Sequence, residues 1–260
     1  MILQNKPQSS PILLILILST ILHSCELTDI ENDLENFNLS GKVSKIRDNS
    51  YEAVEKFGEV TKGELFISTH VDFNETGNRK EINRYNATGS LIRKYKFLYD
   101  ESNLLIEKNI YSGEGTLLEK EKYDYNSYEQ IIQKNLYDAE GKLKTYTGIT
   151  YNDNGEKIAE QYYDAQGSML YKLRYDYDDA GNNTDYIKYN SSEEIEYRYK
   201  YEYDNIGNQI AETFINSDGG TEWEKIFEYE FDDYNNWIIQ ITYRDSEPYR
   251  FREREIEYFN

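Results

Sequence analysis

The chain has 260 residues, and its 29 Lys and Arg against 49 Asp and Glu give a formal net charge of −20 at pH 7. This acidity argues against a nucleic-acid partner, because binding to a phosphate backbone depends on clustered Lys and Arg. One Cys excludes an intramolecular disulfide, and one Cys with two His excludes the usual Cys/His zinc sites, so no cofactor or metal is predicted.

Residues 1–24 are predicted to be an export signal. The stretch from Ile12 to Leu22 is largely apolar over 11 residues, whereas a helix that spans a bilayer needs about 20. Lys6 is the only positive charge before this stretch, and the small residue Ser24 precedes Cys25. This order of basic, apolar and small residues is that of a signal peptide with its cleavage site.

Cys25 is the candidate lipid-attachment residue. The run Leu22-His23-Ser24-Cys25 resembles the lipobox of bacterial lipoproteins, which implies cleavage before the Cys and lipidation of its side chain. Acyl chains on this residue would hold the protein on a membrane without crossing it. The membrane is therefore an expected partner, and an ordinary signal peptide with a chance Cys is the alternative.

Residues 25–38 are predicted to be an acidic tether. The segment from Glu26 to Asn38 has five acidic residues and no basic one. Such a segment repels itself and buries little surface. We expect it to be solvated, and a short amphipathic helix is the alternative.

Residues 39–72 are predicted to be an N-terminal β cap. They include strand-like stretches, at Lys42 to Ile46 and at Glu64 to Ile67, but lack the group that repeats after them. The end units of a repeat array must hide an open sheet edge, which is the role expected for this segment.

Residues 73–260 are a repeat built on an aromatic anchor. The anchor is followed in most copies by Asp or Asn, and Gly comes three positions after that residue. The anchors are Phe73, Tyr85, Tyr99, Tyr111, Tyr125, Tyr137, Tyr151, Tyr163, Tyr177, Tyr189, Tyr203, Ile215, Phe231 and Tyr243. Their intervals alternate between 12 and 14 residues, with one two-residue insertion near Phe231, so the unit is 26 residues with two anchors.

The repeated group predicts a tight turn. Asp or Asn can accept a hydrogen bond from a backbone N–H two residues on, and Gly tolerates the positive φ that closes a type I turn into a bulged hairpin. Asn103 and Asn235 at the Gly position are expected to adopt the same conformation. Glu129, Glu193 and Glu247 at that position predict turns that are strained, altered in type or lengthened.

The segments between turns alternate with period two, as in Lys200-Tyr201-Glu202-Tyr203, which predicts strands with aromatic and charged faces. The fold class is therefore all-β, a repetitive antiparallel β-meander of about 15 strands. So many strands do not stay flat. We predict an elongated, strongly twisted or partly rolled sheet with its Tyr-rich face inward; a stacked solenoid is the alternative.

The last strand is expected to cap the repeat. Arg250, Arg252 and Arg254 fall on one face of it, and Glu253, Glu255 and Glu257 fall on the other. Charges at a sheet edge discourage further pairing of strands. An anion-binding stripe of the three Arg is the alternative.

The repeat resembles a known family. Tyr137-Asp138-Ala139-Glu140-Gly141 and Tyr203-Asp204-Asn205-Ile206-Gly207 resemble the YD repeats of RHS-type proteins. The 26-residue unit, the lipobox, the segment from Ser50 to Gly58 and the end from Arg252 to Tyr258 resemble cell-envelope lipoproteins of Bacteroidota. The resemblance implies a β-repeat architecture and an envelope location, with the outer membrane expected. It implies no catalytic residue.

Two functions are compared. The first is a non-catalytic binding or scaffold module for a protein or a glycan, because repeated Tyr rings suit both kinds of contact; the alternative role for each Tyr is core packing. The second is an envelope polysaccharide hydrolase with paired carboxylates. The acids follow the repeat, and His70 is interpreted as an ordinary strand residue, so the first function is favoured.

Calcium in acidic turns is a minor alternative. Asp176, Asp178 and Asp179, or Asp232 and Asp233, provide clustered carboxylates. Their spacing matches neither an EF-hand loop nor the nonapeptide calcium repeat.

Overall fold

The structure is a computed structural model that describes residues 33–259, which belong to one compact unit, residues 31–260. The predicted signal peptide (1–24), the candidate lipid-attachment residue Cys25 and the first part of the predicted tether lie outside the described residues. No helix within residues 33–259 is long and apolar enough to cross a membrane.

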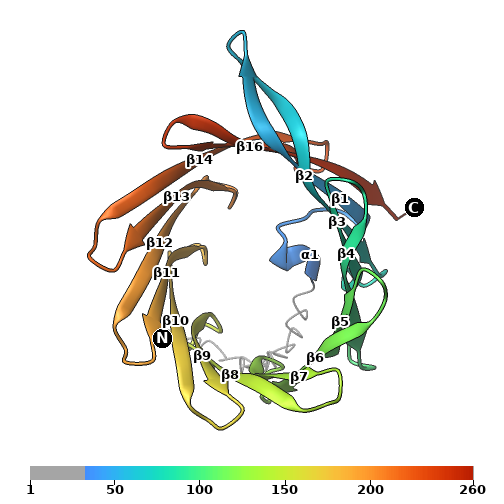
Figure 1. Cartoon of the computed structure of the whole chain (residues 1–260), viewed down its shortest axis with the longest axis vertical. Coiled ribbons are helices and arrows are strands. Elements are labelled where there is room, and N and C mark those ends of the chain that lie inside the picture. The colour runs from blue at the N-terminus through green and yellow to red at the C-terminus, as the bar shows by residue number, and fades with distance from the viewer. Residues whose placement is uncertain (1–32, 260) are drawn as a thin grey trace, which may run out of the picture. The chain divides into compact units, whose positions relative to one another are not determined.

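The described residues form one short helix and 16 strands that close into a barrel (Figure 1). The elements are α1 (Asp33–Asn36), β1 (Val43–Lys56), β2 (Glu59–Phe73), β3 (Arg79–Asn86), β4 (Leu91–Tyr99), β5 (Leu105–Ser112), β6 (Leu117–Tyr125), β7 (Ile131–Asp138), β8 (Leu143–Tyr151), β9 (Lys157–Asp164), β10 (Met169–Tyr177), β11 (Asn183–Asn190), β12 (Ile195–Tyr203), β13 (Gln209–Asn216), β14 (Thr221–Phe231), β15 (Trp237–Arg244) and β16 (Glu247–Tyr258). Each strand pairs antiparallel with its neighbours in sequence. The all-β antiparallel meander is thus confirmed, and the stacked solenoid is wrong.

The sheet rolls completely, which corrects the prediction of an elongated, partly rolled sheet. β1 pairs with β16 from Val43 opposite Tyr258 to Glu52 opposite Arg250. Closure removes both exposed edges, which 16 strands in an open sheet would leave unpaired. Residues 39–72 and the last strand, for which edge-capping roles are predicted, form β1, β2 and β16 and are part of the continuous wall.

The repeated turns adopt the predicted geometry. In the turn after β4, Asp100 Oδ1 accepts hydrogen bonds from the backbone N–H groups of Ser102 and Leu104, both at 2.9 Å. Asn103 stands in the Gly position with φ 63°, and a bulge shifts the register beside Tyr99. These turns fall at two ends of the barrel. We call the end with the β2–β3, β4–β5 and later alternate turns the α1 end, and the opposite end the hairpin end.

The three turns with Glu in the Gly position differ from one another. Glu129 and Glu193 have φ values of 63° and 62°, and each donates the same turn hydrogen bond as Gly does elsewhere, so these residues carry the expected strain. The turn before Glu247 is of another type. Asp245 and Ser246 both have positive φ there, and Arg244 pairs directly with Glu247.

The segment that follows residue 32 packs against the α1 end. Leu34 and Leu39 are buried with Val43 and with Phe73 in a small hydrophobic cluster. Asp33 forms an ion pair of 2.7 Å with Arg79. The last part of the predicted acidic tether therefore packs against the barrel through Leu34, while Phe37 and Asn38 are exposed. Figure 1 shows α1 inside the ring of strands.

Candidate binding site in the barrel lumen

The two kinds of anchor point to opposite faces of the wall. Tyr99 and the later anchors at the α1 end face the lumen, where the Tyr99 hydroxyl donates a hydrogen bond of 2.9 Å to Asp33. Tyr111 and Tyr137, at the hairpin end, face outward and lie under the ammonium groups of Lys96 and Lys122. The predicted Tyr-rich inner face therefore contains only the anchors of the α1 end, and the anchors of the hairpin end lie on the outer face.

Four inner anchors and Tyr229, which lies two residues before the anchor Phe231, hold the α1 end together. Five Tyr hydroxyls each donate a hydrogen bond to the carbonyl 20 residues earlier in the chain, at the start of the preceding strand. These bonds run from Tyr125 to Leu105 (2.8 Å), Tyr151 to Ile131 (3.0 Å), Tyr177 to Lys157 (2.8 Å), Tyr203 to Asn183 (2.8 Å) and Tyr229 to Gln209 (2.6 Å). Burial raises the pKa of Tyr125 and of Tyr177 to about 12, so both stay protonated donors. These five Tyr residues therefore have a structural role, since their hydroxyls bind backbone carbonyls of the barrel wall.

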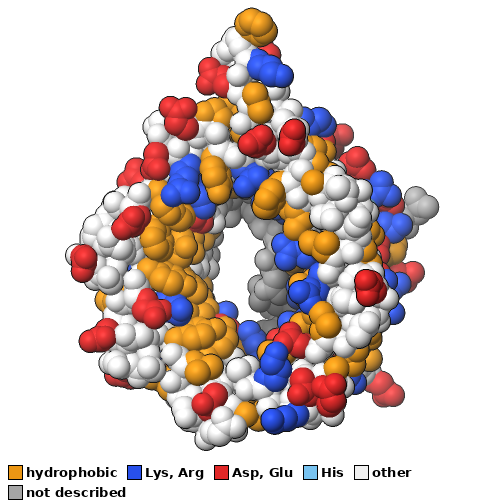
Figure 2. Space-filling view, viewed as in Figure 1, with side chains coloured by type: hydrophobic (Ala, Val, Ile, Leu, Met, Phe, Trp, Pro, Cys, Tyr) orange, Lys and Arg blue, Asp and Glu red, His pale blue; other side chains and the backbone are white. Residues whose placement is uncertain are grey.

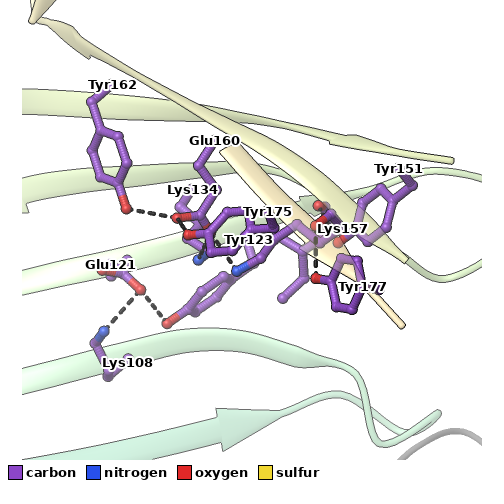
Figure 3. A network of polar contacts seen from close by, with 11 residues as sticks. Lys108, Glu121, Tyr123, Lys134, Tyr151, Lys157, Glu160, Tyr162, Tyr175 and Tyr177 are labelled. Carbon is purple, nitrogen blue, oxygen red and sulfur yellow. Dashed lines mark hydrogen bonds and ion pairs between the residues drawn. The ribbon is translucent and has the colours of Figure 1, made fainter. Parts of the chain in front are cut away.

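Deeper in the lumen, two clusters of ion pairs and hydrogen bonds lie on β5 and β6 and on β7, β9 and β10 (Figure 3). Glu160 accepts hydrogen bonds from Lys134 (3.0 Å), Lys157 (3.1 Å), Tyr162 (2.8 Å) and Tyr175 (3.1 Å). Burial alone would raise the pKa of Glu160, but the two ammonium groups outweigh it and hold the pKa at about 2. This carboxylate is therefore a permanent anion.

Glu121 has a second arrangement of the same kind. Lys108 donates to it at 2.8 Å, and the Tyr123 hydroxyl donates to the same oxygen. Burial opposes the shift, yet Lys108 keeps the pKa of Glu121 below its usual value. A glycosidase needs one carboxyl with a raised pKa to protonate the leaving group. The pKa values of Glu121 and Glu160 are both lowered, so neither carboxyl is of this kind.

Beside Glu121 the lumen contains a cavity of about 500 Å³ bounded by β2 to β7. A 16-stranded barrel is wide enough to leave space that side chains do not fill. Arg79, Arg84, Lys108 and Lys134 line the cavity together with Tyr95, Phe97 and Tyr123, and Glu121 is the one acid among the lining residues. The cavity is therefore cationic and aromatic, although the chain as a whole has a charge of −20.

The opposite side of the lumen is an aromatic wall, which we define as Tyr186, Tyr197, Tyr199, Phe214 and Trp223 on β11 to β14. Neighbouring rings are in contact, with centroids 5.0 Å apart for Tyr199 and Phe214 and 5.3 Å apart for Phe214 and Trp223. All five side chains are only half-buried. Figure 2 shows hydrophobic side chains along this side of the lumen and Lys and Arg on the side of β3 to β7.

Two of the three Arg of the predicted anion-binding stripe on β16 are already paired with an acid. Arg252 and Arg254 both bind Asp48 of β1, and the Arg254 guanidinium lies 3.3 Å from the Trp237 ring centroid. Burial lowers the pKa of Arg254 to about 10. These contacts close the barrel between its first and last strands.

The other residues considered from sequence have ordinary surroundings. His70 lies on β2 against the Tyr85 ring, with centroids 4.7 Å apart, and burial lowers its pKa. Asp176 pairs with Arg174, and Asp178 accepts turn hydrogen bonds. Within the described residues, no group of three or more His, Cys, Asp or Glu could hold a metal ion. Sequence reasoning missed Arg84 and the aromatic wall: Tyr197 and Tyr199 share the face of their strand's anchor Tyr203, whereas Arg84 lies on the face opposite its own strand's anchor Tyr85.

No family model and no curated protein matches the chain. Among solved structures, it is similar to a porin-like protein from Bacteroides uniformis, with 12% identity, a TM-score of 0.54, and coverage of 84% of this chain and 98% of that one. A porin-like protein from Bacteroides vulgatus matches at 13% identity with a TM-score of 0.39, covering 84% of this chain and 99% of that one. The Photorhabdus luminescens Tc holotoxin pore matches at 11% identity with a TM-score of 0.29, covering 80% of this chain and 14% of that one. Because the Bacteroides uniformis protein is only 12% identical to this chain, the similarity is one of fold alone.

Proposed function

We propose that this protein is a non-catalytic, lipid-anchored barrel of the cell envelope that binds a glycan in its lumen. The observation that carries the proposal is the aromatic wall, whose five rings touch one another yet remain half-buried. Rings that served only as core would be covered by other side chains. Flat rings with polar edges are suited to stacking on sugars and to hydrogen bonds with hydroxyl groups.

The outer face of β12 supports anchoring by lipid rather than insertion in it, although other strands expose apolar residues there, such as Leu98 of β4 and Ile226 of β14. On β12 the residues that alternate with the inward Tyr are Glu196, Arg198, Lys200 and Glu202, all charged. On the outer face of β1 and β16, Arg47 pairs with Glu255 at 3.4 Å. A barrel that spans a membrane carries an apolar band on its outer face instead. An anchor at Cys25 would keep such a barrel at the membrane.

The chain has only two Trp, which gives a direct binding test. Trp223 belongs to the aromatic wall and has Lys225 and Arg244 over its ring, whereas Trp237 lies outside this wall and contacts Arg252 and Arg254. In Trp237→Phe, Trp223 is the only Trp reporter, and its fluorescence should change when an oligosaccharide binds. The matched control Trp223→Phe, which reports from Trp237, should show no such change. Glycan arrays without any bound glycan, or equal changes in both variants, would overturn the proposal.

The anchor is tested separately. Cys25→Ser should abolish labelling with a fatty-acid probe and move the protein from the membrane fraction to the soluble fraction. Membrane association that persists in Cys25→Ser would contradict the lipid anchor without bearing on the lumen.

A further inference from the structure

Two arginines face each other in the lumen without an acidic partner. Arg84 of β3 and Arg93 of β4 are directly opposite in the register, so their side chains share the inner face. Like charges in this position are destabilising. Across the described part of the chain, no carboxylate lies within ion-pair distance of either guanidinium, and Arg84 is exposed to the cavity it lines.

Other cations of the same cavity are neutralised. Arg79 pairs with Asp33, Lys108 pairs with Glu121, and Lys134 pairs with Glu160, at 2.7, 2.8 and 3.0 Å. The chain therefore places acids beside the other cations that line this cavity but leaves this pair of like charges uncompensated. An unfavourable arrangement held in a cavity points to a ligand that relieves it.

The two neighbours in the same row add hydrogen-bond donors. Thr69 of β2 is opposite Arg84, and Ser112 of β5 is opposite Arg93. Four adjacent strands thus present a hydroxyl, two guanidinium groups and a second hydroxyl on one face. Guanidinium groups bind carboxylate, sulfate and phosphate through paired N–H groups.

Aromatic rings lie next to this row. Tyr95 and Phe97 follow Arg93 on the same face of β4, and both line the cavity. A cavity of about 500 Å³ is within the range of small-ligand sites, roughly 300–1,000 Å³. Ring stacking beside an anion site is the combination that an acidic sugar requires.

We propose that Thr69, Arg84, Arg93 and Ser112 bind the anionic group of an acidic saccharide, with Tyr95 as a platform for its ring. This inference rests on the proposed function and narrows it to glycans that carry a carboxylate, sulfate or phosphate. Because added salt screens the attraction between the guanidinium groups and the anionic group, the affinity should fall as salt is added.

The test compares three probes on the full chain by calorimetry: an oligogalacturonide, an oligosaccharide of chondroitin sulfate and a neutral malto-oligosaccharide. Arg84→Gln and Arg93→Gln should each weaken binding of an acidic probe at least about tenfold, since charge-assisted hydrogen bonds contribute about 1.5–3 kcal/mol. Preference between the first two probes identifies the anion. Arg47→Gln, which removes an outward Arg, should leave the affinity unchanged.

A stability measurement separates binding from folding. Relief of the like-charge pair should leave Arg84→Gln and Arg93→Gln as stable as the wild-type protein or more stable. Wild-type affinity of acidic probes for both variants, or marked destabilisation of both, would overturn the inference. If the neutral probe binds as tightly as the acidic ones, through Trp223, the proposed function stands and this inference fails. If no saccharide binds, the proposed function fails; stabilisation by free sulfate that is lost in Arg84→Gln would then show a simple anion site, and the saccharide assignment would be wrong.

Discussion

The hydroxyl of Tyr151, at the end of β8, donates a hydrogen bond of 3.0 Å to the carbonyl of Ile131, the first residue of β7. Ile131 lies beside the bulge of the β6–β7 hairpin, where the register shifts between Asp124 and Tyr125. The Tyr of the following strand supplies the donor for the carbonyl next to the bulge. The anchor therefore has two roles, since its ring fills the lumen side of the wall and its hydroxyl completes the turn of the neighbouring hairpin.

Removal of one such hydroxyl tests this role. Tyr177→Phe keeps the ring but leaves the carbonyl of Lys157 without its 2.8 Å donor. The free energy of unfolding should fall by about 1–2 kcal/mol, the usual cost of a partly buried group that loses its partner. Urea unfolding measures the change. Tyr137→Phe, on an outward anchor, is the control and should change the stability by less than about 0.5 kcal/mol.

Substitution at the strained turns should increase the stability of the barrel. Glu129 and Glu193 occupy a left-handed conformation that costs a residue with a side chain about 1 kcal/mol. Glu129→Gly should therefore stabilise the barrel by about 0.5–1 kcal/mol, despite the greater freedom of Gly in the unfolded chain. Gly141→Ala, at the equivalent position with φ 85°, should destabilise it by a similar amount. Thermal unfolding of both variants measures the pair, and a loss of stability in Glu129→Gly would contradict the strain.

The local structure follows from the sequence because each turn encodes its own geometry. Asp100 and Asn103 specify the bend after β4 without help from distant residues. Closure of the barrel is not local. It depends on the pairing of β1 with β16, where Asp48 meets Arg254 across 206 positions of the chain. The repeat period does not predict how many strands are needed to close the barrel.

The candidate site could be predicted only in part. Alternation identifies the inner face once Tyr95 is assigned to it, and Arg93 then falls on the same face by counting two residues back. The register that brings Arg84 opposite Arg93 depends on the length of the turn between them. The absence of an acid beside this pair, within the described residues, required the positions of all neighbouring strands.

The pH dependence of stability should report on Glu160. Its pKa is about 2 in the folded protein against an ordinary value of 4.5, because Lys134 and Lys157 outweigh the effect of burial, so its stabilising contribution is complete above pH 4.5 and is lost as the pH falls towards 2. Over this window the wild-type protein should lose roughly 3 kcal/mol more than Glu160→Gln. Unfolding midpoints in urea at several pH values measure the difference. Glu255→Gln, on the outer wall, should retain the wild-type profile, and parallel profiles for Glu160→Gln and wild type would contradict the assignment.

Asp33 should control whether the segment from α1 to Lys42 stays in the α1 end. Its carboxylate pairs with the Arg79 side chain at 2.7 Å and accepts hydrogen bonds of 2.9 Å from the Arg79 backbone N–H and the Tyr99 hydroxyl. Asp33→Asn leaves the Arg79 charge without a partner in a half-buried position, at a cost of roughly 3 kcal/mol. This cost falls on the segment, because the strands keep their own hydrogen bonds. Hydrogen exchange should therefore accelerate at Leu34 and Leu39 while the amides of β3 and β4 stay protected. Arg47→Gln, which breaks an exposed ion pair, is the control for the loss of one salt bridge. Unchanged exchange at Leu34 in Asp33→Asn would show that the buried Leu residues alone hold the segment.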